Sequence, residues 1–127
     1  MPYLHQNRFD PKPLELEGVR GIAVDQNGNV MAQLCVGLFS EPDHQLLRYA
    51  QSDNKGAFTV ETKGLPDGQY RFVGQLVGFC PANAVVNINS RSQKKKLLEV
   101  HMSLPGTTTC SYVKVRKNNT ISVQGEN

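Results

Sequence analysis

Short apolar stretches alternate with clusters of turn residues along most of the chain, and this pattern begins at Gly18. Within the stretches, apolar and polar residues alternate as they do in a strand with one buried face. No segment keeps a helical period over several turns. The expected strands cover residues 18–25, 30–39, 46–52, 57–62, 70–79, 84–89, 97–104 and 111–116. This spacing is typical of an all-β fold, a seven- or eight-stranded antiparallel β-sandwich.

Two of the expected strands define the core most clearly. In 97–104, the alternation predicts a strand with Leu98, Val100, Met102 and Leu104 on its buried side and Glu99, His101 and Ser103 on its polar side. In 30–39, the residues expected to face the core are Val30, Ala32, Leu34, Val36 and Leu38.

Turn residues separate these strands. The expected structural turns contain Asp25, Gly28, Asp53, Gly56, Pro66 and Gly68. Glycine tolerates a positive φ, and aspartate hydrogen-bonds nearby backbone amides, so these residue types favour tight reversals. Asp25 and Asp53 also offer the oxygen ligands that calcium prefers, but their loops lack the further carboxylates of a strong site. Turn formation is therefore the favoured interpretation, and weak calcium binding stays open.

The strands define one domain over residues 17–117. Residues 1–16 are polar and rich in proline, which predicts an extended lead-in, and residues 118–127 are expected to form a frayed tail. The start of the chain lacks the apolar segment and the cleavage site of a signal peptide. A cytoplasmic chain and an exported chain whose signal has been removed both fit this observation.

The charge pattern does not favour nucleic acid as a partner. The net charge is +3, and the densest basic stretch, Arg91 to Lys96, is best interpreted as a solvated loop. No apolar run approaches the ~20 residues of a membrane span, so no transmembrane segment is expected.

Three turn motifs carry a resemblance to a known family. They are G-I-A-V-D-Q-N-G at 21–28, S-D-N-K-G-A-F at 52–58 and L-P-D-G-Q-Y-R-F at 65–72. Together with Gly78–Phe79 they resemble the carboxypeptidase regulatory-like domain, over about residues 17–104. G-F-C-P-A-N at 78–83 and the later Cys-Ser-Tyr at 110–112 are similar to a bacterial cell-envelope subgroup.

The resemblance implies a transthyretin-like (prealbumin-like) Greek-key sandwich and an accessory role. We therefore expect a non-catalytic structural or protein-binding module of a bacterial envelope or secreted protein. The expected location is periplasmic or extracellular, with a cytoplasmic one not excluded. The alternative is a carbohydrate- or peptide-binding module with a defined ligand, for which the candidate contact aromatics are Tyr49, Phe79 and Tyr112.

Motifs for chemistry are missing from the sequence. His5, His44 and His101 do not form a zinc spacing, and His101 is expected to be an ordinary exposed histidine. No nucleophile elbow and no phosphate loop is present. We expect no enzymatic activity, no metal and no cofactor, and the oligomeric state stays open.

The three cysteines allow at most one internal disulfide. Cys80 and Cys110 both lie at expected strand ends, and a bridge between them would pin the C-terminal segment to the sandwich. Cys35 lies within an expected strand and is predicted to be a protected free thiol. The alternative is three free thiols in a reducing compartment.

Overall fold

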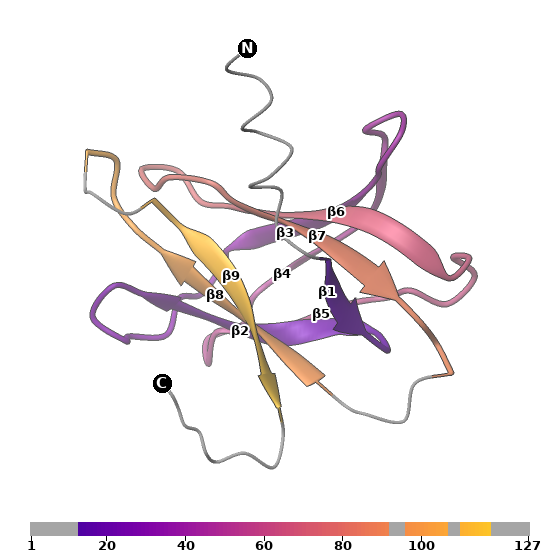
Figure 1. The fold of residues 1–127 in the computed structure, drawn as a ribbon. Coiled ribbons are helices and arrows are strands. Elements are labelled where there is room, and N and C mark those ends of the chain that lie inside the picture. The colour runs from indigo at the N-terminus through magenta and orange to yellow at the C-terminus, as the bar shows by residue number, and fades with distance from the viewer. Residues whose placement is uncertain (1–12, 92–95, 107–109, 118–127) are drawn as a thin grey trace.

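The strands of the computed structural model form two sheets that face each other (Figure 1). The structure describes residues 13–91, 96–106 and 110–117. Within these residues it has nine strands and no helix: β1 (Leu14–Leu16), β2 (Val19–Asp25), β3 (Cys35–Ser40), β4 (Leu46–Gln51), β5 (Ala57–Val60), β6 (Gly68–Gln75), β7 (Ala82–Ile88), β8 (Lys96–Met102) and β9 (Tyr112–Lys117). The predicted all-β sandwich is confirmed.

The two sheets differ in size. One has five strands in the order β1-β7-β6-β3-β4, and the other has four in the order β5-β2-β8-β9. Most neighbours are antiparallel, but β1 pairs with β7 in parallel, and so does β2 with β8. Parallel neighbours need a crossover, and here the strands that lie between the two partners along the chain, which belong to both sheets, supply it. The prediction of seven or eight antiparallel strands was wrong in these details, because local alternation does not reveal pairing partners.

The additional strand, β1, lies in the segment that was predicted to be an extended lead-in. Leu16 is buried and pairs with Ile88, while Leu14 is partly buried against the core. Leu14 and Leu16 lie on the same face of this three-residue strand, because side chains alternate between faces, and that face packs against the core. Residues 1–12 of the lead-in, residues 92–95 of the basic stretch and residues 118–127 of the predicted tail lie outside the described residues.

The core lies between the sheets and is built from alternate residues of their strands. Phe72 of β6 and Phe58 of β5 stack across it with ring centroids 5.8 Å apart. On β8, the predicted core positions Leu98, Val100 and Met102 are fully buried. Leu104 is exposed, contrary to prediction, because β8 ends at Met102 and the chain turns away.

The segment before β3 breaks the predicted alternation. Val30 forms only an isolated bridge with Val24, and both Val30 and Ala32 are exposed, where the sequence pattern had placed them in the core. Gln33 has a φ of 64° and therefore interrupts any strand that runs through it. Met31 takes the buried position instead, so the regular strand begins only at Cys35.

Candidate functional site

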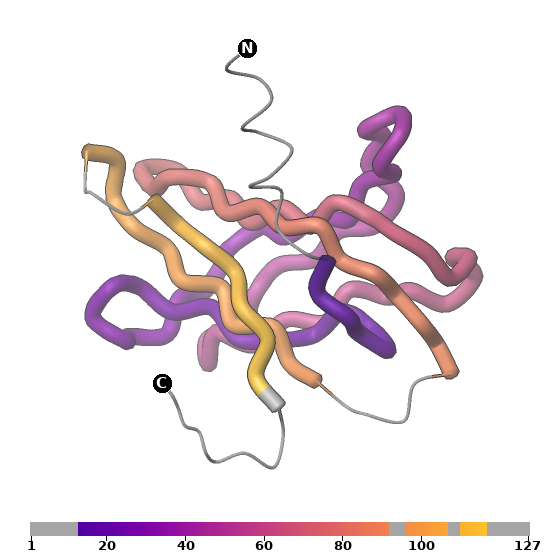
Figure 2. The backbone as a smooth tube through the Cα atoms, viewed as in Figure 1, coloured from indigo at the N-terminus to yellow at the C-terminus, as the bar shows by residue number. Residues whose placement is uncertain are grey.

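β4 is the last strand in the order of the five-stranded sheet, and it carries the most exposed large hydrophobic side chains of any described edge strand. Tyr49 is 75% exposed and Leu46 is 53% exposed. Both follow the projecting turn that joins β3 to β4 (Figure 2). We call the surface formed by Leu46, Arg48, Tyr49 and Gln51 the β4 edge. A strand in this position presents backbone groups as well as side chains to a partner.

In β4, the backbone N–H and C=O groups of every second residue point towards the partner strand, β3. Ser52 N donates to Leu34 O at 3.0 Å, so Ser52 directs its hydrogen-bonding groups towards β3. Because these groups alternate in direction along an antiparallel ladder, Ala50 and Arg48 also face β3. The N–H and C=O groups of Tyr49 and Gln51 consequently point away from β3. Among the described strands, β4 pairs with β3 alone.

Arg48 borders these free backbone groups. Its Nη1 donates to Leu47 O at 2.9 Å, and its Nη2 donates to Lys63 O at 3.3 Å. No ion pair joins Arg48 to an acid within the described residues. The β4 edge therefore combines an exposed aromatic ring, two unpaired backbone units and a guanidinium that has no acidic partner.

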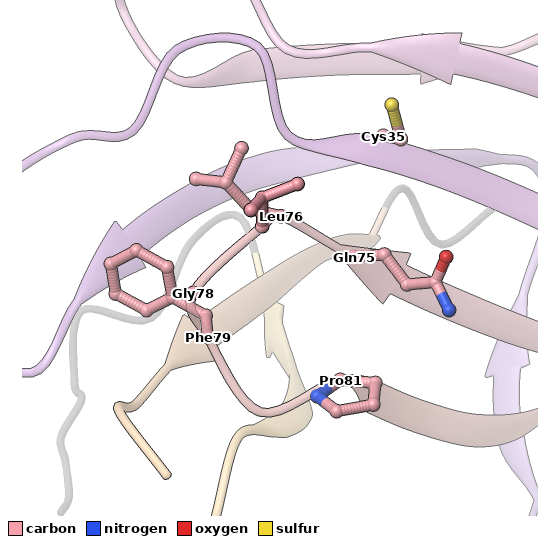
Figure 3. Close-up of a pocket in the computed structure, with 7 residues that line it drawn as sticks. Cys35, Gln75, Leu76, Gly78, Phe79 and Pro81 are labelled. Carbon is pink, nitrogen blue, oxygen red and sulfur yellow. The ribbon is translucent and has the colours of Figure 1, made fainter.

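A shallow hollow lies on the same side of the five-stranded sheet, towards its end. It has a volume of about 370 Å³ and is lined largely by the loop between β6 and β7, with Cys35 contributed by β3 (Figure 3). Val77 in this loop is 98% exposed. Cys35 is a free and exposed thiol, so the prediction that it is protected was wrong. Since Val36 faces the core, its neighbour must face outwards.

The three aromatic residues predicted to contact a ligand lie apart. Tyr49 is on β4, Phe79 is in the β6–β7 loop and packs partly against the core, and Tyr112 is on β9 of the other sheet. The Tyr112 ring stacks on His101 with centroids 4.7 Å apart. The structure therefore brings no two of these aromatics together into one platform.

Charged groups gather on the outer face of β8 and β9. Glu99 is only 8% exposed, whereas the sequence pattern had placed it on the polar side of its strand. Side chains of β9 cover it: Arg116 Nε bonds to Oε2, and Lys114 Nζ lies 3.7 Å from Oε1. His101 Nε2 lies 3.1 Å from the same oxygen, and this histidine is half-buried rather than exposed as predicted. The cluster ties β9 to β8.

Burial of the Glu99 carboxyl opposes its ionisation, but hydrogen bonds from His101 and Arg116, with the charges of Arg116 and Lys114, outweigh this effect and lower its pKa. Because the folded-state pKa lies below the unfolded one, ionised Glu99 stabilises the fold above the unfolded pKa, and this contribution is lost as the pH falls through the folded pKa. The effect belongs to the acid range, below neutral pH.

Replacing Glu99 by glutamine should therefore lower the free energy of unfolding at pH 7 by roughly 1.5–3 kcal/mol, the usual range for a hydrogen bond to a charged group. The difference between Glu99→Gln and the unchanged chain should shrink as the pH falls towards 3. Urea unfolding at several pH values measures it. Glu61→Gln is the matched control, because Glu61 is an exposed acid directly after β5. This replacement should change the free energy of unfolding little. A difference that does not depend on pH would contradict this account.

The predicted turn residues lie in two turns of the same design and in a third turn. Asp25 Oδ1 accepts hydrogen bonds from Asn27 N and Asn29 N, both at 2.9 Å. Asp53 Oδ1 accepts equivalent bonds from Lys55 N and Ala57 N, at 2.9 and 3.0 Å. The third residue after each aspartate is a glycine with positive φ, 84° at Gly28 and 78° at Gly56. These carboxylates thus serve their own turns, and the bonds from Asn29 and Asn27 lower the pKa of Asp25 despite the cost of desolvation.

The third turn is held by a side chain from β6. The Tyr70 hydroxyl donates to the carbonyl oxygen of Pro66, and Gly68 follows with a φ of 147°.

Within the described residues, no group of three or more histidine, cysteine or acidic side chains could hold a metal ion.

Cys80 and Cys110 form a disulfide in the structure, with Cα atoms 5.8 Å apart and a sequence separation of 30. Ser111 reinforces the connection: its hydroxyl donates to Cys80 O and accepts from Ser103 N at 2.8 Å. The bridge fixes the segment that leads into β9.

A membrane-spanning helix, long and apolar enough to cross a bilayer, is absent from the described segments.

Comparisons with known proteins identify no family for this chain. No protein-family model matches the sequence. No curated protein matches it either. Among solved structures, the chain is similar to 3-chlorocatechol 1,2-dioxygenase from Rhodococcus opacus 1CP, with 13% identity over 87% of this chain and 69% of that one, and a TM-score of 0.38. At this TM-score the similarity has no bearing on function.

Proposed function

We propose that this chain is a non-catalytic accessory domain of an exported protein and that it acts by binding another protein. The observation that carries the proposal is the β4 edge, where exposed Tyr49 and Leu46 stand beside free backbone groups. Exposed aromatic residues are enriched at the centres of protein interfaces. A protein ligand fits this surface better than a sugar does, because Tyr49, Phe79 and Tyr112 do not form one platform.

The disulfide supports the exported location. Structural disulfides persist in oxidising compartments such as the periplasm and the exterior, and they are rare in the cytoplasm. The resemblance of the turn motifs to carboxypeptidase regulatory-like domains of bacterial envelope and secreted proteins points the same way. An accessory domain in that setting needs a stable scaffold and an accessible surface, and the bridged sandwich with its β4 edge provides both.

Site-specific photo-crosslinking tests the binding role. The full chain is produced in its native host with the photoreactive residue p-benzoylphenylalanine in place of Tyr49. Irradiation should give a discrete protein adduct, because Tyr49 projects from the proposed contact surface. The same replacement at Asn27, an exposed position in the β2–β3 turn, is the control and should give no adduct. Absence of an adduct from position 49, or equal adducts from both positions, would contradict the proposal.

The non-catalytic part of the proposal has its own test. The purified chain should show no turnover in a broad panel of esterase, peptidase and glycosidase substrates. Hydrolysis that is lost on replacing a single residue would overturn this part and leave the binding result unaffected.

A further inference from the structure

We propose that the β4 edge binds its partner by strand addition, and that the partner is an extended segment with an apolar residue beside Tyr49 and an acidic residue beside Arg48. This inference rests on the proposed function and specifies its ligand. In strand addition, backbone hydrogen bonds hold the peptide while alternate side chains select its sequence. Both elements are present at the β4 edge.

The backbone groups define a short and bounded window. Tyr49 and Gln51 each offer one N–H and one C=O to the open side of the sheet. At one end, Arg48 Nη1 already occupies Leu47 O. At the other end, Asp53 N is bonded to Ala57 O at 2.9 Å, where the chain turns into β5. An added strand can therefore pair with residues 49–51.

The side chains give the window its selectivity. Tyr49 lies on the outer face of the sheet, so the residue opposite it in an added strand also lies on that face and gains apolar contact with the ring. Arg48 belongs to the other face, so the adjacent residue of the added strand faces the guanidinium. The Arg48 guanidinium donates to two carbonyl oxygens, those of Leu47 and Lys63, and a carboxylate there would form a charge-assisted bond.

The other described edges are poorer templates. β9 carries Lys114 and Arg116, and long basic side chains on an edge discourage pairing. β1 has three residues and β5 has four. Tyr112 of β9 is also exposed, at 43%, but its ring stacks on His101. Among the described edge strands, β4 therefore joins the most exposed ring, Tyr49, to backbone groups whose direction follows from its register.

A second copy of this chain fits the window less well than a different partner does. Antiparallel pairing of two β4 strands about Ala50 would place each Arg48 opposite Ser52 of the other copy, so the guanidinium would still lack an acid. The charge of Arg48 therefore favours a segment that carries a carboxylate.

A peptide titration of the full chain tests the inference. The probe is the peptide Ac-Ser-Glu-Val-Thr-Val-Glu-Ser-NH2, which presents valine to Tyr49 and glutamate to Arg48 in either strand direction. The control peptide has lysine in place of both glutamates. Nuclear magnetic resonance should show saturable shifts of the amides of Tyr49 and Gln51 with the glutamate peptide, and at least about tenfold weaker binding of the lysine peptide.

Two proline variants separate strand addition from other binding. Gln51→Pro removes an N–H that points away from β3 and should weaken binding at least about tenfold without breaking the β3–β4 ladder. Asn54→Pro, at an exposed turn position whose N–H bonds to no described residue, is the matched control and should bind as the unchanged chain does. If Gln51→Pro melts at a markedly lower temperature than the unchanged chain, Arg48→Glu replaces it as the test variant. Arg48→Glu should bind the lysine peptide more tightly than the glutamate peptide.

The inference is overturned if the unchanged chain does not bind the glutamate peptide, if both peptides bind equally, or if Gln51→Pro binds as well as Asn54→Pro. A dimer in sedimentation that Gln51→Pro abolishes would assign the window to a second copy and would also overturn it. If the photo-adduct at position 49 persists in Gln51→Pro, the protein-binding function stands and strand addition is wrong. If position 49 gives no adduct in the unchanged sequence, the function itself fails.

Discussion

Replacing Gly21 by alanine should destabilise this chain by about 3 kcal/mol or more, the upper part of the range for forcing extra atoms into a packed core. Gly21 lies in the middle of β2, between Phe58 of β5 and Leu98 of β8. A Cβ atom at this position would lie 2.1 Å from the carbonyl oxygen of Leu98 and 2.9 Å from the Phe58 ring. The first contact is with backbone, which cannot move aside as a flexible side chain can.

Gly18→Ala provides the matched comparison. Gly18 stands just before the same strand, and a Cβ there would meet no atom within 4 Å. Its replacement should change the free energy of unfolding by no more than about 0.5 kcal/mol. Urea unfolding followed by circular dichroism measures both variants. A loss of less than about 1 kcal/mol in Gly21→Ala would mean that β2 and β8 are less closely packed than the structure shows.

Gly21 also illustrates which parts of the fold the sequence could predict. The turn motif that contains it was found from residue type and order, and the alternation of β8 placed Leu98, Val100 and Met102 in the core. These features depend on local chemistry: glycine in turns and apolar side chains at every second position. That Gly21 must lack a side chain depends on the parallel pairing of β2 with β8, strands that lie far apart in sequence.

The departures from the sequence pattern have the same origin. Glu99 lies on the outer side of its strand as predicted, but it is buried there because side chains from β9 cover it. The alternation before β3 fails at Gln33 because its backbone is held by Ser52, which is distant in sequence: Gln33 N donates to Ser52 O at 2.9 Å. Tertiary contacts of this kind override a local pattern.

The candidate site was predictable only in part. Tyr49 was among the possible ligand-contact aromatics from the sequence. Its importance comes from the position of β4 at the end of the strand order, which is a property of topology. The free backbone groups of Tyr49 and Gln51 follow from the register of β4 on β3, and the lack of an acid beside Arg48 follows from the packing of the described residues. A search for catalytic or metal-binding motifs does not detect such a surface.

Removal of the disulfide should have the other large effect on stability. The bridge closes a loop of 30 residues, and the chain-entropy relation gives roughly 3–4 kcal/mol for a loop of that length. The double variant Cys80→Ser, Cys110→Ser should accordingly melt roughly 10–20 °C lower than the oxidised chain. The hydrogen bonds that Ser111 makes with Cys80 O and Ser103 N do not require the bridge. If they persist in the double variant, the fall in melting temperature should lie near the lower end of this range.

Cys35→Ser is the control for the loss of a thiol. Cys35 is exposed and its Sγ contacts only the Gln51 side chain among the described hydrogen-bonding groups, so this variant should change stability by no more than about 0.5 kcal/mol. Calorimetry with and without reductant measures the effect, and peptide mapping under non-reducing conditions should recover Cys80 linked to Cys110 with Cys35 free. A melting temperature that reductant leaves unchanged, or a bridge that contains Cys35, would contradict the pairing. Either result would also remove the main support for an oxidising compartment, because the disulfide is the structural feature that favours export.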